Sequence, residues 1–237
     1  MGLLSKVQSA QQEVQMEEVK DSIGGFSYWP SDVYDLTINM AFLRESSGGS
    51  IGLNLFLKND KGQQFRTILY LTSNLANGQK TFSVVEGKNI PKAAYVLGDN
   101  IAKIITNTSL FDLEEEERTV MLYDFDARAE KATKVPALPE LIGGKFKGGI
   151  LHRKANKQVQ DNSGKWVPTA DITESNVLSK VFNEEGFTVL EAEAEAEKTD
   201  LMDAWLDKYK GQVDDRVKSV SGSTSSSAAA PTTSMFN

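Results

Sequence analysis

Three successive segments near the start of the chain alternate apolar and polar residues with a period of two, which is the period of a half-buried β-strand. They are residues 33–44, 51–58 and 65–71, and short polar turns that contain glycine separate them. In the first segment the residues of one face are all apolar: Tyr34, Leu36, Ile38, Met40 and Phe42. Because short turns join antiparallel neighbours, the sequence predicts a three-stranded meander.

The pattern then changes to a helical period in residues 91–107, where Pro91 suits the first turn of a helix. The other predicted elements are a strand at 119–123, a short helix at 135–142, a long strand at 145–154, its hairpin partner at 165–169, and a fourth short strand or hairpin arm at 79–85. This order of elements favours a mainly β protein with added helices, built on an OB-fold-like Greek-key β-barrel with a helix after its third strand. An open β-sandwich shows similar periodicity and remains an alternative.

Composition divides the chain into four parts. An N-terminal arm, residues 1–25, precedes a core over residues 26–183. An acidic helical segment over residues 184–218 carries an apolar stripe around Trp205 that is expected to pack on the core. Residues 219–237 are mostly Ser, Thr and Ala, too poor in large apolar side chains to offset the entropy of ordering, so a disordered tail is predicted.

Several classes of protein are disfavoured by composition. No apolar run approaches the ~20 residues that cross a bilayer, and residues 1–20 lack the apolar core of a signal peptide, so we expect a cytoplasmic protein with no membrane contact. The absence of cysteine excludes a disulfide framework and a zinc-thiolate site. His152 is the single histidine, and Glu114 to Glu117 are expected to form the acidic first turn of a short helix. We therefore expect no enzyme activity, cofactor or metal.

The sign of the charge reverses along the chain. Residues 128–165 hold nine Lys and Arg against three Asp and Glu, a net charge of +6, whereas residues 184–215 hold eleven acidic residues against three lysines, a net charge of −8. The whole chain carries −7, so the basic stretch creates a local field of the opposite sign. A basic patch beside strands that carry aromatic residues is typical of a nucleic-acid groove.

Aromatic residues on the predicted strands are the candidate base-stacking groups. If the alternating leucines face inward, Phe56, Arg66 and Tyr70 face outward on adjacent strands, where the rings stack on bases and Arg66 pairs with a phosphate. The alternative is that Phe56 and Tyr70 pack under the loop at residues 77–89 or beneath the C-terminal helix.

The candidate phosphate-binding residues form a denser basic set. They are Arg128, Lys131, Lys134, Lys145, Lys147, Arg153 and Lys154. Lys80 and Phe82 extend the aromatic surface if the fourth strand neighbours the third. Because a run of charges is often only a solvated face, that interpretation stays open for each single lysine.

Several motifs are similar to those of one known family. They are residues 122–130, residues 136–143, the pair Ile150-Leu151, the turn Thr72-Ser73, the hairpin at 164–169, the helix at 205–209 and the small-residue linker that ends in Met235-Phe236. On these motifs the chain resembles, from about residue 33 to its end, the bacteriophage single-stranded DNA-binding proteins, which are the helix-destabilising proteins of phage replication. The resemblance implies an OB-fold core that coats single strands without sequence preference.

The resemblance also implies a role for the tail. Its apolar tip, Met235 and Phe236, is expected to recruit phage or host replication and recombination proteins. Two features depart from the family: residues 79–84 are less aromatic than is usual there, and the tip of the tail has no acidic residue.

Together these observations predict a non-enzymatic, sequence-nonspecific single-stranded DNA-binding protein of phage DNA replication or recombination. Two alternatives stay open. One is a phage structural β-domain protein whose basic stretch is a solvated surface. The other is a transcription cofactor that also binds single strands.

Overall fold

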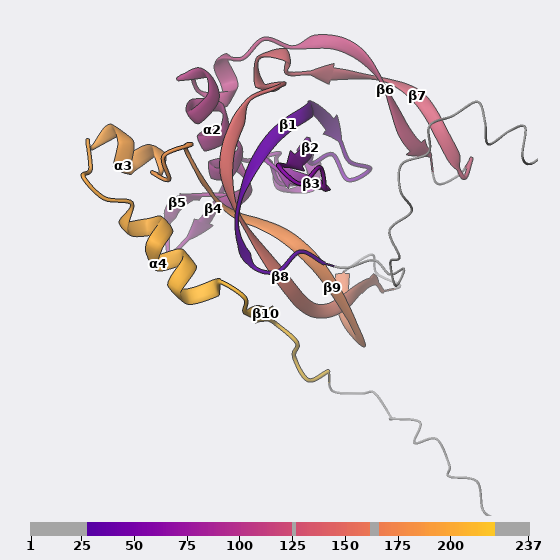
Figure 1. Ribbon diagram of the computed structural model, residues 1–237. Helices are drawn as coiled ribbons and strands as arrows, with labels where there is room; N and C mark the ends of the chain where they lie inside the picture. Colours follow the sequence, from indigo (N-terminus) through magenta and orange to yellow (C-terminus); the bar gives the residue numbers. More distant parts are fainter. Residues whose placement is uncertain (1–27, 125–126, 162–165, 221–237) are drawn as a thin grey trace, which may run out of the picture.

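A computed structural model describes residues 28–124, 127–161 and 166–220 of the chain (Figure 1). In these residues one strongly curved sheet of eight strands forms most of the structure, which confirms the predicted mainly β class. The predicted N-terminal arm, the tail beyond residue 220 and the candidate partner-binding residues Met235 and Phe236 lie outside the described residues.

The predicted three-stranded meander is confirmed. It consists of β1 (Asp32–Glu45), β2 (Ile51–Asn59) and β3 (Gln64–Tyr70), and each strand is antiparallel to the next. The alternating leucines of β2, such as Leu53 and Leu55, are fully buried in the main core. The face of the sheet that carries these leucines is its inner face, and the opposite face is its outer face.

β1 departs from the predicted alternation at Asn39. The register with β2 shifts between Ile38 and Met40, so a bulge turns the residues that follow to the opposite face. Ile38 belongs to the main core, whereas Phe42 belongs to a second, smaller cluster on the outer face. The prediction of one apolar face over residues 34–42 is therefore wrong beyond the bulge.

β1 pairs with β2 along one edge, and three successive elements run along its other edge. They are β7 (Ala129–Ala137), the 3-10 turn η3 (Pro139–Leu141) and β8 (Lys145–Gln160). Phe42 pairs with Ala137, and the first residues of β8 pair with the first residues of β1. β7 and β8 thus act as one interrupted strand antiparallel to β1.

The short helix predicted over residues 135–142 is wrong. The segment is the end of β7 followed by η3. Val135 and Ala137 alternate into the outer cluster, which requires an extended backbone. Pro136 and Pro139 also remove backbone donors that the interior of a helix needs.

Two long hairpins leave the sheet at the two ends of β1. One pairs β6 (Glu116–Asp124) with β7, and the other pairs β8 with β9 (Trp166–Phe182). Both extend to the same side of the molecule in Figure 1, one above β2 and β3 and the other below them. Glu116 and Glu117 lie in β6, so the prediction of a helical first turn there is wrong.

The predicted helix after β3 is confirmed as α2 (Ala93–Thr106), which covers the inner face, but Pro91 ends the strand before it and does not lie in its first turn. Gly98 permits this close contact, because a Cβ atom there would lie 3.1 Å from the side chain of Leu71. A 3-10 turn, η2 (Leu110–Asp112), follows the helix.

β4 (Phe82–Val85) and β5 (Lys88–Pro91) form a separate two-stranded sheet. The 3-10 turn η1 (Leu75–Asn77) lies in the connection that leads to it from β3. β4 pairs with β5 and not with β3, so Lys80 and Phe82 do not extend the β3 surface as a neighbouring strand.

The acidic segment packs on the core as predicted. It forms α3 (Val189–Glu193), α4 (Asp200–Tyr209) and β10 (Val213–Asp215), and β10 pairs parallel to β8. Trp205 of α4 is buried, and its indole N–H donates a hydrogen bond of 3.1 Å to the hydroxyl oxygen of Ser179. α4 therefore covers the outer face where β8 meets the start of β1.

Within the described residues, the strands do not close into a hydrogen-bonded barrel, because β3 and β9 do not pair. Trp29 lies between these two strands. Its backbone N–H and C=O bond to the side chain of Asn176 in β9 at 2.9 and 2.8 Å, and its ring centroid lies 5.8 Å from that of Phe65 in β3. Trp29 thus bridges the two strands through its backbone on one side and its ring on the other, in place of a strand ladder.

Candidate nucleic-acid interface

The outer face of the main sheet is covered in two places. At one end Trp205 of α4 packs on β8, and at the other end Val120 of the β6–β7 hairpin packs with Phe42 of β1. Between these two covers the outer side of β3 stays open. Ile68 and Tyr70 expose 49% and 47% of their surface there.

The strand register arranges the outer-face side chains in rows across β1, β2 and β3. The rows are Arg44, Gly52 and Tyr70; Phe42, Asn54 and Ile68; Met40, Phe56 and Arg66; and Thr37, Lys58 and Gln64. Lys145 of β8 lies opposite Thr37 and extends the last row. We define the outer patch as six members of these rows: the cations of β1, β2 and β3 and the apolar residues of β2 and β3, namely Arg44, Phe56, Lys58, Arg66, Ile68 and Tyr70.

Phe56 lies at the centre of the outer patch but is only partly accessible. Its ring meets the ring of Phe42 edge-on, with centroids 5.7 Å apart. The guanidinium carbon of Arg66 lies 4.5 Å from the Phe56 ring centroid, a cation–π contact. A base that stacks on Phe56 therefore has to displace Arg66, so Tyr70 is the more accessible stacking group.

Tyr70 and Ile68 lean over Gly52 of the neighbouring strand. A Cβ atom at Gly52 would lie 2.8 Å from a methyl carbon of Ile68 and 3.4 Å from the Tyr70 ring. The missing side chain thus lets both residues lie close to the sheet, where they form a low apolar surface. Aromatic surfaces of this kind stack on any base, since every base has a π-face.

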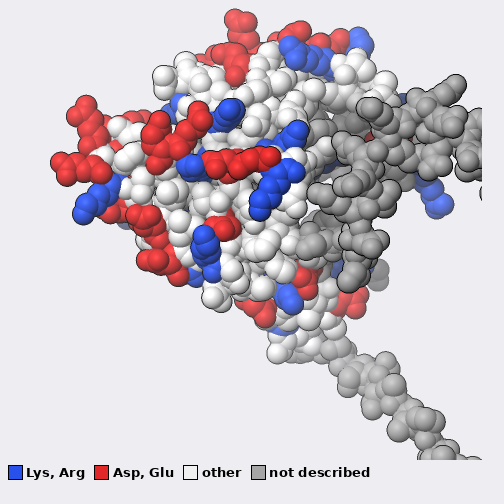
Figure 2. Space-filling model, in the orientation of Figure 1, with Lys and Arg blue, Asp and Glu red and all other residues white. Residues whose placement is uncertain are grey.

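The cations of the outer patch have no acidic partner in the part of the chain that the structure describes. Among the described residues, no carboxylate lies within ion-pair distance of Arg44, Lys58 or Arg66. In the view of Figure 2, acidic side chains are densest over the flank that α3 and α4 occupy in Figure 1. Positive charge on the outer patch is therefore available to a polyanion.

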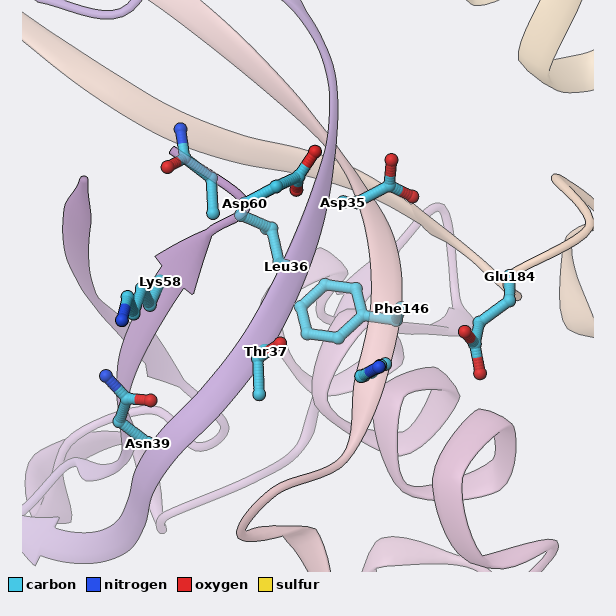
Figure 3. Close-up of a pocket in the computed structure, with 10 residues that line it drawn as sticks. Asp35, Leu36, Thr37, Asn39, Lys58, Asp60, Phe146 and Glu184 are labelled. Carbon is cyan, nitrogen blue, oxygen red and sulfur yellow. The ribbon is translucent and has the colours of Figure 1, made fainter. Parts of the chain in front are cut away.

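A hollow of about 590 Å³ opens beside the last row, with Phe146 among the residues that line it (Figure 3). Its charged lining residues are Asp35, Lys58, Asp60, Lys145 and Glu184. Three carboxylates against two ammonium groups give this hollow a net negative charge, which disfavours a phosphate. Arg66 and Arg44 are therefore better candidates for phosphate contacts than Lys58, and Lys145 lies at the margin of the rows.

Four other cations that the sequence analysis gave as candidate phosphate-binding residues form ion pairs. The pairs are Lys134 with Glu117 at 2.7 Å, Lys147 with Asp35 at 2.5 Å, Arg153 with Asp214 at 2.7 Å, and Lys154 with Glu174 at 3.2 Å. These cations are spread over the β6–β7 hairpin and the two halves of β8 rather than gathered in one cluster. Their charge is compensated locally, which weakens its attraction for a polyanion.

The pair of Arg153 and Asp214 ties β10 to β8. Burial raises the pKa of Asp214, but hydrogen bonds and charge from Arg153 and Arg216 outweigh burial and hold the pKa below its ordinary value. A hydrogen bond from His152 is the largest cause of the lowered pKa of Glu174. The middle of β8 therefore uses its basic side chains to attach neighbouring segments.

The remaining candidates from the sequence analysis are Arg128, Lys131, Lys80 and Phe82, and none of them belongs to the rows of the outer face. Arg128 and Lys131 are exposed on the β6–β7 hairpin. The ammonium nitrogen of Lys80 lies 5.8 Å from the ring centroid of Phe82. The backbone N–H of Ser73 donates to the carbonyl oxygen of Lys80, which keeps Lys80 near the Tyr70 end of β3.

Sequence reasoning missed three members of the outer patch. Ile68 and Lys58 follow the same alternation that selects Arg66, so that signal was sufficient to find them. The alternation in the sequence does not identify Arg44 as an outer-face residue, because the bulge in β1 changes the face of the residues that follow it. Trp166, which exposes 62% of its surface at the start of β9, is a further aromatic candidate.

No protein-family model and no curated protein matches this chain. In residues 28–124, 127–161 and 166–220, no three Asp, Glu or His side chains converge as a metal site. The helices in that part of the chain are all too short or too polar to span a bilayer.

Proposed function

We propose that this chain is a sequence-nonspecific single-stranded DNA-binding protein that holds the strand on its outer patch. One observation carries the proposal: Tyr70 and Ile68 lie exposed on the outer face, in the row of Arg44 and in the row between Arg44 and Arg66, two cations that form no ion pair in the described residues. Apolar stacking surface next to compensating positive charge is what a single strand requires.

We also propose that the main sheet is an OB-fold-like Greek-key sheet. The chain order of three strands, α2 and two further long strands supports this, as does the spatial order β9, β8, β1, β2 and β3. In OB folds the second and third strands bind oligonucleotides, and loops on either side bound the site. In this order the β8–β9 hairpin joins the fourth and fifth strands, and in Figure 1 it lies on one side of β2 and β3.

The chemistry of the outer patch favours single strands over duplex. Tyr70 stacks on a base only when the base is unpaired, and such stacking contributes ~1–3 kcal/mol per base. Arg66 and Arg44 contact phosphates, which are the same for every sequence, so little base preference is expected. A protein that binds only the open form melts secondary structure by mass action, without enzyme activity or a cofactor.

Binding to fluorescent oligonucleotides tests the proposal. We expect tight binding of single strands of any sequence and much weaker binding of the matching duplex. The logarithm of the single-strand affinity should fall with the logarithm of salt concentration, by ~0.7 per phosphate neutralised. Equal affinity for single strands and duplex, or a single-strand affinity that does not change with salt concentration, would overturn the proposal and favour a structural β-domain.

We propose that the protein acts in phage DNA replication or recombination in the cytoplasm of the host. This proposal rests on the resemblance carried by residues 122–130 and 136–143. The tail has a separate role in it, because an apolar peptide on a tether gains effective concentration near enzymes at the coated strand. Deleting residues 234–237 should leave oligonucleotide affinity unchanged and abolish co-purification with replication proteins. Retained capture of the same proteins would remove Met235 and Phe236 from the proposal.

A further inference from the structure

β1 and β7 pair at a single position and then separate. Phe42 pairs with Ala137, and the backbone N–H of Leu138 donates to the carbonyl oxygen of Ala41 at 3.0 Å. In an antiparallel ladder, hydrogen-bonded and non-hydrogen-bonded pairs alternate. The next hydrogen-bonded pair in this register would join Leu43 to Pro136.

Pro136 explains why the ladder stops. Proline has no backbone N–H, so it cannot donate to the carbonyl oxygen of Leu43. Beyond this point the strands diverge, and a pocket of about 470 Å³ opens between them. Leu43 and Ile51 line it from the meander, and Val135 and Pro136 line it from β7. The pocket is therefore largely apolar, with one backbone acceptor that β7 leaves without its ladder donor.

The charges of this pocket balance. Arg44 and Lys134 line it together with Glu45 and Glu115. A phosphate inside the pocket gains little, because Glu45 and Glu115 line it together with the two cations. A neutral, flat group with apolar faces and N–H donors on its edge fits better, because it buries its faces and can donate to the Leu43 carbonyl oxygen. A nucleobase has this chemistry.

The pocket adjoins the outer patch. Arg44 lines the pocket and also belongs to the row that holds Gly52 and Tyr70. Neighbouring strands lie ~4.8 Å apart, so Tyr70 lies ~10 Å from Arg44 across the sheet. A single strand that stacks one base on Tyr70 therefore passes Arg44 and reaches the pocket within a few nucleotides.

We propose that the pocket between β1 and β7 is a second base-binding subsite, which takes one unpaired base of the same single strand. Arg44 holds the phosphate between the two subsites, and the Leu43 carbonyl oxygen accepts a hydrogen bond from the base. This inference rests on the proposed function, since it assigns a further contact to the same strand.

A variant that fills the pocket tests the inference. Thr133 lines the pocket, so Thr133→Phe should occupy it, whereas Ala132→Phe places the same ring on the exposed side of the same strand. For an oligonucleotide long enough to reach both subsites, Thr133→Phe should weaken binding roughly 5- to 150-fold, the equivalent of one lost base contact. Ala132→Phe should bind as the unaltered protein does. If Thr133→Phe lowers the melting temperature, the smaller Thr133→Leu replaces it.

Oligonucleotides with one abasic position separate the two subsites. With the unaltered protein, abasic substitution should weaken binding at two positions a few nucleotides apart. Thr133→Phe should remove the sensitivity at one of them and Tyr70→Ala at the other. If the unaltered protein binds single strands while Thr133→Phe and Thr133→Leu match it at every position, the pocket is not a subsite and the proposed function stands. If the unaltered protein does not bind single strands, the proposed function itself fails.

Discussion

The outer patch and the middle of β8 both present basic side chains on a strand, yet their surroundings differ. Arg66 of the outer patch lies over an aromatic ring and has no carboxylate partner in the described part of the chain. Arg153 of β8 is bonded to Asp214, which lies sixty-one residues further along the chain. The comparison shows that a basic residue becomes available to a ligand only where the fold brings no acid to it.

The difference also separates affinity from stability. Removing a cation from the outer patch breaks no ion pair among the described residues, so we expect it to weaken DNA binding and not folding. Removing Arg153 leaves the Asp214 carboxylate without its main partner, so we expect it to lower the free energy of unfolding. Four predictions test this division, in order of decreasing effect.

The largest effect is expected for Tyr70→Ala. Loss of one stacking contact should weaken single-strand affinity by ~1–3 kcal/mol and leave the melting temperature nearly unchanged, because the ring is half exposed. Fluorescence titration and thermal unfolding measure the two quantities. Phe111→Ala is the matched control, since this ring exposes 67% of its surface on η2, away from the outer patch. A drop in melting temperature with unchanged affinity would place Tyr70 in the core.

Arg153→Ala should lower the free energy of unfolding by about 1–2 kcal/mol and leave DNA affinity within twofold. The value lies below that of a fully buried pair, because the side chains of Arg153 and Asp214 are 23% and 15% exposed. Denaturant titration measures the change, and Lys157→Ala, at an exposed position of the same strand, is the control. Weaker DNA binding at unchanged stability would return Arg153 to the set of phosphate contacts.

The salt dependence of binding should change only for the outer patch. Arg66→Ala should make the slope of log affinity against log salt shallower by ~0.7, the value for one phosphate contact on a single strand. Lys154→Ala should leave the slope unchanged, because Glu174 compensates Lys154 in the folded protein. Titrations at several salt concentrations measure both slopes. A shallower slope for Lys154→Ala alone would reverse the comparison.

The smallest effect concerns pH. Because the pKa of Asp214 is lower in the folded protein than in the unfolded chain, its contribution to stability is present above the ordinary carboxyl pKa of ~3.9 and is lost as the pH falls through the folded value. Asp214→Asn should therefore reduce the free energy of unfolding by less than about 1 kcal/mol at pH 7, and the difference should shrink below about pH 4. Denaturant titrations at pH 7 and pH 3 measure it. A difference that grows towards low pH contradicts the assignment.

Local periodicity was sufficient for the elements whose neighbours are close in sequence. The meander of β1, β2 and β3 and the helix α2 follow from alternation, turn residues and helical spacing, since each is decided within about a dozen residues. The apolar stripe around Trp205 likewise predicts that α4 packs on the core. Long-range information is not needed for these elements.

The errors arise where distant contacts override local pattern. Residues 135–142 contain an apolar spacing that suits a helix, but Val135 is held extended by β6 and by the cluster around Phe42. The bulge at Asn39 changes the face of every residue after it in β1, because side chains alternate with a period of two. This change decides that Arg44 belongs to the outer patch.

The sequence by itself determined that this chain is mainly β, that a helix follows its third strand, and that aromatic and basic residues occur on its strands. The tertiary structure alone decided which of these residues reach solvent together. Arg66 and Tyr70 stay available because α4 and the β6–β7 hairpin cover other parts of the sheet. Arg153 does not, because β10 brings Asp214 to it. Electrostatic attraction weakens with distance and is screened by salt beyond about 10 Å, and only the folded chain sets the distances between these charges.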